Sequence, residues 1–173
     1  MFSDPIKNLK AFEIRETDVV ADLGAGTGYY SIPSAQMANK GKFYAVELAR
    51  DFLQTISNKV KEAKLDNIEC LWGDVEKTGG SKLRDMSIDK AIVSNVLFQI
   101  ENKESFIEEI NRILKKHGEV LVIDWAEESP MAHKSLVIAE DKMKRMFEQK
   151  GFKQEREIDA GEHHYGMIFI KEN

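Results

Sequence analysis

A strand-like run that leads directly into three closely spaced glycines constrains this chain more than any other part of its sequence. Residues 19–23 read VVADL, and residues 24–28 read GAGTG. The apolar run is typical of a buried strand, and a helical pattern continues from Tyr29 to Met37. Because glycine accepts positive φ and lets another molecule approach the backbone, the segment predicts a strand, a sharp turn and a helix whose free N–H groups face a ligand.

The spacing of the glycines favours one kind of nucleotide ligand over another. It is G-x-G-x-G, whereas the dinucleotide fingerprint is G-x-G-x-x-G, and the third glycine of that fingerprint would fall at Tyr29. A bulky side chain at this position makes the turn better suited to a nucleoside ligand without a pyrophosphate than to NAD.

Pro33 does not fit the regular helical pattern that follows the turn. Proline is tolerated only in the first turn of a helix. The helix therefore either starts later, with Ser31 as its cap, or has an irregular first turn. We favour the irregular first turn.

Strand-like and helix-like patterns alternate along most of the chain. The expected strands are residues 19–22, 42–47, 68–72, 90–94 and 119–124. Apolar residues recur at helical spacing in 51–64 and in 103–116, and Gly118 is the expected stop of the second helix. This alternation implies βαβ units, and hence a parallel sheet covered by helices on both faces.

The C-terminal part of the chain has a different pattern. A helix is expected over 140–150, with Gly151 at its C-terminal end. Two extended segments, 153–158 and 165–171, then follow with only a short polar stretch between them. A parallel crossover needs a dozen or more residues, so these segments predict an antiparallel hairpin.

Composition excludes several classes of protein. A length of 173 residues indicates one domain, 1–173. The net charge of −5 argues against broad attraction to nucleic acid or anionic membranes, and no apolar run reaches the roughly 18 residues of a membrane span. The N-terminal residues lack the features of a signal peptide, and the single cysteine, Cys70, excludes an intrachain disulfide. We expect a soluble, cytoplasmic protein, either a monomer or a homodimer, with no metal.

Polar residues repeatedly follow the expected parallel strands. Ligands of open parallel sheets bind beyond the carboxyl ends of the strands. The polar residues at those positions are Asp22, Glu47, Asp74, Ser94, Asn95 and Asp124. Glu47 lies nineteen residues after Gly28, and its carboxylate can accept the two hydrogen bonds that a ribose diol donates.

Four stretches in this order resemble the motifs of the class I S-adenosylmethionine-dependent methyltransferases. They are DLGAGTG at 22–28, VEL at 46–48, GDV at 73–75 and DKAIVSN at 89–95, and residues 113–121 resemble the step that leads to the fifth strand. The resemblance covers about residues 15–125. It implies an α/β, Rossmann-like, doubly wound sheet of seven mostly parallel strands in the order 3-2-1-4-5-7-6, and S-adenosylmethionine as cofactor.

The resemblance also implies roles for individual residues. The glycine turn would lie against the methionine moiety and ribose, Glu47 would bind the ribose hydroxyls, and Asp74 would accept from the adenine amino group. Leu48 would contact the adenine. The implied cofactor-binding residues are Asp22, Gly24, Ala25, Gly26, Gly28, Tyr30, Glu47, Leu48, Gly73, Asp74, Val75 and Ser94.

The acceptor side is less defined, because methyl transfer needs a general base only when the acceptor must lose a proton. The candidate residues there are His133, Asp124 and Asn95. The pair His163-His164, expected in the hairpin turn, is a weaker candidate. An aromatic pocket near the methyl group could be lined by Tyr29, Tyr30, Phe98 and Trp125. Residues 1–9 form either a lid over the cofactor or the start of a surface helix.

The expected activity is methyl transfer to a small-molecule acceptor. The motif spacing is closest to that of the ubiquinone- and menaquinone-biosynthesis enzymes, although this chain is shorter. A non-catalytic S-adenosylmethionine-binding protein is the alternative, and an NAD-dependent oxidoreductase is a more distant one. DNA amino-methyltransferases usually carry Asn/Asp-Pro-Pro-Tyr/Phe after the fourth strand, where this chain reads SNVL at 94–97, so no nucleic acid partner is expected.

Overall fold

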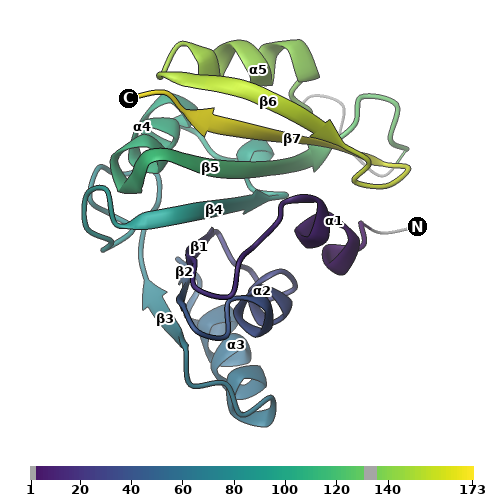
Figure 1. The fold of residues 1–173 in the computed structure, drawn as a ribbon. Helices are drawn as coiled ribbons and strands as arrows, with labels where there is room; N and C mark the ends of the chain where they lie inside the picture. Colours follow the sequence, from purple (N-terminus) through teal and green to yellow (C-terminus); the bar gives the residue numbers. More distant parts are fainter. Residues whose placement is uncertain (1–2, 131–135) are drawn as a thin grey trace.

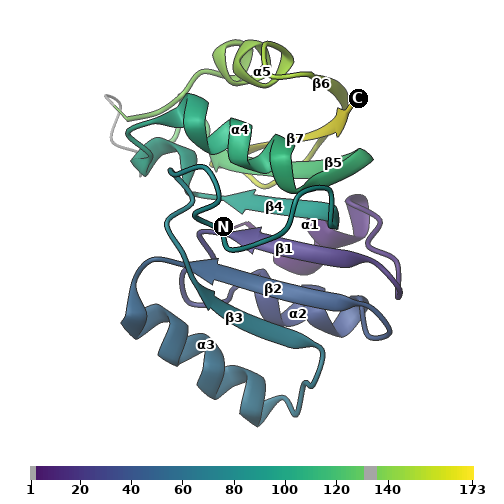
Figure 2. The same cartoon turned by 90° about the vertical axis from the view of Figure 1, so that its left-hand side faces the viewer.

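The computed structural model describes residues 3–130 and 136–173 and shows one seven-stranded sheet. The strands are β1 (Val19–Leu23), β2 (Lys42–Glu47), β3 (Ile68–Trp72), β4 (Ile88–Ser94), β5 (Leu114–Trp125), β6 (Phe152–Ile158) and β7 (His164–Lys171). Their order is β3-β2-β1-β4-β5-β7-β6, which confirms the predicted order (Figure 2). β1 to β5 pair in parallel and β7 pairs antiparallel with both β5 and β6, so the predicted hairpin is confirmed as well.

Helices cover both faces of this sheet. They are α1 (Pro5–Ala11), α2 (Ser31–Met37), α3 (Arg50–Glu62), α4 (Lys103–Ile113) and α5 (Glu140–Glu148), with a short 3₁₀ helix at Leu97–Gln99. Figure 1 shows α4 on one side of the sheet and α1 and α2 on the other. The apolar sides of α1, α2 and α3 contribute to one buried cluster, and those of α4 and α5 contribute to a second.

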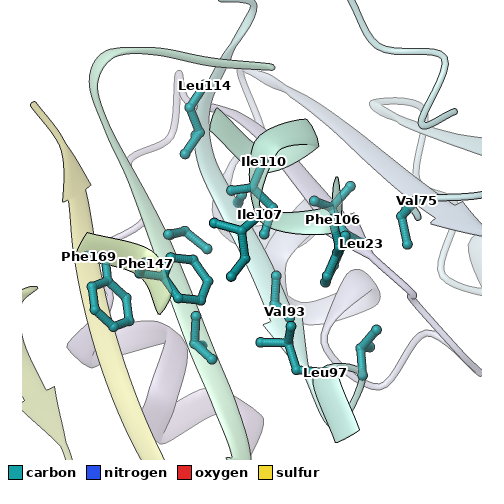
Figure 3. Packing of buried hydrophobic residues seen from close by; sticks show 14 of the residues in the cluster. Leu23, Val75, Val93, Leu97, Phe106, Ile107, Ile110, Leu114, Phe147 and Phe169 are labelled. Carbon is teal, nitrogen blue, oxygen red and sulfur yellow. The ribbon is translucent and has the colours of Figure 1, made fainter. Parts of the chain in front are cut away.

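The second cluster shows how the helical spacing of the sequence becomes a core. Phe106, Ile107 and Ile110 of α4 point toward the sheet, where they lie near Val93 of β4 (Figure 3). On the α5 side of this core, the rings of Phe147 and Phe169 stack with their centroids 4.5 Å apart. All of these side chains are buried, so this packing holds α4 and α5 against the same face of the sheet.

The end of α4 differs from the sequence prediction. The helix stops at Ile113 rather than at Lys116, and Gly118 lies inside β5 instead of ending a helix. Leu114 is buried and pairs with Ile88 of β4, so strand pairing overrides the local helical pattern. Gly118 is nevertheless required by close packing, because a Cβ there would lie 2.9 Å from the carbonyl oxygen of Lys115.

The start of α2 was also predicted incorrectly. The turn continues through Tyr30, the helix begins at Ser31, and Pro33 is its third residue. The favoured irregular first turn is therefore wrong. Ser31 is not the cap either, since Tyr30 holds that position and the Ser31 hydroxyl donates to Asp22. The positive φ values of the glycine turn delay the helix.

Candidate active site

The first cavity lies beyond the carboxyl ends of β1, β2 and β4 and has a volume of about 450 Å³. All predicted cofactor-binding residues except Gly28 line it. These residues are Asp22, Gly24, Ala25, Gly26, Tyr30, Glu47, Leu48, Gly73, Asp74, Val75 and Ser94. The parallel pairing of the strands thus brings together residues that are spread over more than seventy positions of the sequence. Their roles toward the cofactor remain predictions.

The three glycines of the turn have positive φ but different surroundings. A Cβ at Gly24 would lie 2.6 Å from the side chain of Val96, and one at Gly28 would lie 3.1 Å from that of Ile56. A Cβ at Gly26 would have nothing within 4 Å. Gly24 and Gly28 therefore allow close packing within the protein, whereas Gly26 leaves open space in the cavity, as a cradle for a bound molecule requires.

Glu47 ties this turn to the start of α3. Its carboxylate accepts hydrogen bonds from the backbone N–H groups of Gly26, Leu48 and Ala49, each at 2.8 Å. A carboxylate has about four lone-pair sites, so about one remains for a ligand hydroxyl. Glu47 therefore holds the glycine turn in place, and its role toward ribose stays a prediction.

Asp22 is buried at the end of β1. Its carboxylate accepts from the Ser31 hydroxyl at 2.7 Å. Burial raises the pKa of Asp22 to about 7, since the charged form is desolvated; the Ser31 hydrogen bond lowers it and the charge of Glu47 raises it. This carboxyl group therefore changes its charge near neutral pH, at the edge of the first cavity.

Asp74 lies in the loop after β3. Its carboxylate is 2.7 Å from the ammonium of Lys77 and accepts from the backbone N–H of Glu76 at 3.2 Å. The hydrogen bond from Lys77 is the main reason that the pKa of Asp74 is lowered, although desolvation opposes it. Asp74 is therefore ionised at neutral pH and can accept a hydrogen bond from an amino group.

A second cavity, of about 320 Å³, adjoins the first. It is lined by Ser3, Tyr29, Tyr30, Asn95, Trp125 and His164, so Tyr29, Tyr30 and Asn95 border both cavities. Trp125 of β5 is paired with His164 of β7 in the sheet, and their rings stack with centroids 4.3 Å apart. Both ring nitrogens of His164 are buried without a hydrogen-bond partner among the residues that the structure describes.

The N-terminal segment forms part of the wall of the second cavity. The Ser3 and Tyr30 hydroxyls are 2.9 Å apart, the Asn8 amide donates to the Tyr30 hydroxyl at 2.8 Å, and the Tyr29 hydroxyl donates to the backbone oxygen of Ser3 at 2.9 Å. The helix α1 follows at Pro5–Ala11, and its residues Asn8 and Leu9 are buried. The role of this segment as a lid remains a prediction.

The three residues predicted on the acceptor side differ in where they lie. Asn95 lines both cavities and has a φ of 55°, a left-handed conformation that asparagine tolerates. Asp124 lines neither of the two. It is buried, and its carboxylate accepts from the backbone N–H groups of Trp125 and Phe98. Burial raises the pKa of Asp124 to about 6. His133 lies outside the described residues.

The remaining aromatic and histidine candidates differ in their positions. Phe98 does not line either cavity, whereas Trp125 lines the second. His164 is the first residue of β7 rather than part of the hairpin turn, because the ladder with β5 extends to Trp125. His164 therefore lies beside Trp125 at the second cavity, a position that no local sequence pattern indicates.

The described residues hold no group of three or more His, Cys, Asp or Glu side chains that could bind a metal ion. Among the same residues, no helix is long and apolar enough to cross a membrane.

Comparison with known proteins decides the family. A family model described as "Methyltransferase domain" matches residues 14–162. The chain belongs to this family of methyltransferases. A solved structure of a SAM-dependent methyltransferase from Aquifex aeolicus is 26% identical and superposes with a TM-score of 0.89, covering 98% of this chain and 90% of that chain. The methyltransferase family and its fold together establish S-adenosylmethionine as the cofactor.

Relatives in sequence carry diverse names. "Probable ribosomal RNA small subunit methyltransferase A" of Pyrococcus furiosus is 29% identical over 118 residues, which are 68% of this chain and 37% of that protein. "Demethylmenaquinone methyltransferase" of Listeria welshimeri is 25% identical over 122 residues, 70% of this chain and 50% of that protein. The methyltransferase chain thus spans less than two thirds of the length of these curated relatives.

Proposed function

We propose that this methyltransferase binds S-adenosylmethionine in the first cavity and methylates a small molecule held in the second. The observation that carries the proposal is the shared border of the two cavities at Tyr29, Tyr30 and Asn95. When bound, S-adenosylmethionine would supply a methyl group on a sulfonium sulfur: a nucleophile would attack the methyl carbon in line while the bond from that carbon to the sulfur breaks, which releases S-adenosylhomocysteine. Two ligands in adjoining cavities can be aligned for such a displacement, and alignment alone accounts for much of the rate of a two-substrate reaction.

The protein's own residues would position both ligands. Gly26 gives the cofactor access to the backbone, and Glu47 holds that glycine in place. Asp74 is ionised and faces the same cavity, where it can accept from the adenine amino group. On the acceptor side, most of the described residues that line the cavity are aromatic and offer flat apolar surfaces to the acceptor.

Small molecules are the favoured acceptor class for two reasons. The second cavity is at the lower end of the range of about 300–1,000 Å³ for ligand pockets. The chain also has a net charge of −5, which opposes general attraction to a phosphate backbone. The name of the Pyrococcus relative nevertheless makes RNA the second candidate, since that protein is a ribosomal RNA methyltransferase by name.

The test is the conversion of S-adenosylmethionine to S-adenosylhomocysteine in the presence of fractions of a cell extract. One fraction contains metabolites that pass an ultrafiltration membrane, a second contains purified RNA, and a third contains protein. The proposal predicts turnover with the metabolite fraction. Turnover with RNA alone would assign the activity to nucleic acid, and binding of the cofactor without turnover in any fraction would favour the non-catalytic alternative.

A further inference from the structure

His164 is a buried polar residue whose two ring nitrogens add no hydrogen bond to the described fold. The residue is only 7% exposed, and neither ring nitrogen has a hydrogen-bond partner among the described residues. A buried polar group without a hydrogen bond costs about 1–3 kcal/mol. Stacking on Trp125 would be served equally well by an apolar ring, so the imidazole nitrogens require another explanation.

The other polar groups of the second cavity are largely satisfied by one another. The hydroxyls of Ser3 and Tyr30 bond to each other and to Asn8, and the Tyr29 hydroxyl donates to the Ser3 backbone. The buried polar atoms that remain without a partner at this cavity are the two nitrogens of His164 and the amide oxygen of Asn95. Among the described residues that line this cavity, none is an Asp, Glu, Lys or Arg.

We propose that the second cavity binds a flat, uncharged ring compound that carries a hydroxyl or N–H group, with its ring against the Trp125–His164 pair and its polar hydrogen donated to a ring nitrogen of His164. The inference rests on the proposed function, because it names the class of the methyl acceptor. The described lining residues offer no charged partner to an ionic ligand, and a charge without a partner is costly in such a site. The volume suits a compound of one or two fused rings.

The protonation state of His164 agrees with this assignment. Burial lowers the pKa of His164 below its usual value of 6.5, and the neighbouring His163 acts in the same direction. Near neutral pH the imidazole is therefore uncharged, so one nitrogen is an acceptor for the ligand and the other is a donor. Asn95, between the two cavities, offers its free amide oxygen to the same ligand.

The proposal can be tested by binding alone, without knowledge of the natural acceptor. The probes are 7-hydroxycoumarin and 7-methoxycoumarin, which share a flat bicyclic ring and differ in one donor hydrogen. Each is titrated calorimetrically into the protein saturated with S-adenosylhomocysteine. We expect the hydroxyl compound to bind about tenfold or more tightly than the methoxy compound, because only it can satisfy His164.

Variants assign this preference to one residue. His164→Phe keeps an aromatic ring against Trp125 but removes both nitrogens, so it should bind the two coumarins equally. Its affinity for S-adenosylhomocysteine should stay unchanged. His163→Gln is the matched control, since His163 adjoins His164 in sequence but does not line the cavity, and it should keep the wild-type preference. His164→Leu replaces His164→Phe if the larger ring prevents folding, as judged by circular dichroism.

The results that would contradict this ligand proposal differ from the result that would contradict the proposed function. Equal binding of the two coumarins to the wild type, no binding of either, or a preference that survives in His164→Phe would each overturn the proposal. Those results would leave cofactor binding intact. Absence of S-adenosylhomocysteine binding to the wild type would instead overturn the proposed function itself.

Discussion

Gly24 and Gly26 are two residues apart and both have positive φ, yet substitution should affect them differently. A Cβ at Gly24 would lie 2.6 Å from Val96, whereas one at Gly26 would enter open space. We expect Gly24→Ala to lower the thermal midpoint of unfolding by several degrees through overpacking. We expect Gly26→Ala to cost only about 1–2 kcal/mol in backbone strain but to weaken S-adenosylhomocysteine binding roughly tenfold. Calorimetry and thermal melts separate the two effects; equal cofactor affinities for both variants would contradict the account.

Asp22 should make the stability of the protein depend on pH. Its pKa is raised from 3.8 to about 7 in the folded chain, so between these values the folded state keeps a proton that the unfolded state has lost. The free energy of unfolding should therefore fall as the pH rises from about 4 to about 7. The upper limit of this contribution is roughly 4 kcal/mol, because one pKa unit corresponds to about 1.4 kcal/mol.

Urea unfolding of the wild type and of Asp22→Asn at pH 5 and pH 8 measures that contribution. Asp22→Asn should gain stability relative to the wild type at the higher pH. Asp124→Asn is a useful comparison, since the pKa of Asp124 is raised only to about 6 and its contribution should be smaller. An Asp22→Asn variant with the wild-type dependence on pH would show that another group is responsible.

At the scale of elements, α4 supports the loop that carries Asp74. The Glu109 carboxylate is fully buried, and it accepts from the backbone N–H groups of Gly79 and Ser81 and from the Arg112 guanidinium. Burial raises the pKa of Glu109, but the hydrogen bonds from Arg112 and Ser81 outweigh it and leave the pKa lowered. The loop in turn closes on itself, because the Asp74 N–H donates to the Gly80 oxygen.

Glu109→Ala should therefore lower both stability and cofactor affinity. It leaves the backbone N–H groups of Gly79 and Ser81 without their acceptor, while Arg112 keeps Asp85 as a partner, so a loss of about 2–3 kcal/mol of unfolding free energy is expected. It also releases the loop that holds Asp74 at the first cavity. Glu108→Ala is the control on the same helix, because Glu108 is exposed and pairs with Lys150 at the surface, so a loss of less than about 1 kcal/mol is expected. Similar losses for the two variants in urea unfolding would be inconsistent with the role of Glu109.

The elements also show which parts of the structure can be predicted from the sequence. The strands and their order follow from alternating patterns together with the four motifs, and the glycine turn identifies the edge of the sheet at which the site lies. Local patterns fail where contacts with distant residues decide the structure. Leu114 continues a helical pattern but pairs with β4, and His164 looks like a turn residue but pairs with Trp125.

At the scale of the whole molecule, the second cavity depends on chain segments that are distant in sequence. Ser3 comes from the N-terminal segment, Tyr30 from the turn before α2, Trp125 from β5 and His164 from β7. No motif links these positions, which is why the first cavity was largely predictable and the second was not. The antiparallel pairing of β7 with β5, which Figure 1 shows, brings His164 of the C-terminal hairpin to the second cavity.

The most direct measurement is a calorimetric titration of the wild type and of Glu47→Ala with S-adenosylmethionine and with S-adenosylhomocysteine. We expect the wild type to bind both at micromolar concentration, at about one site per chain. We expect Glu47→Ala to bind each at least roughly tenfold more weakly, since the variant frees the glycine turn and removes the proposed ribose acceptor. Binding of neither compound to the folded wild type would contradict the central claim, and an unchanged affinity of the variant would remove Glu47 from the site.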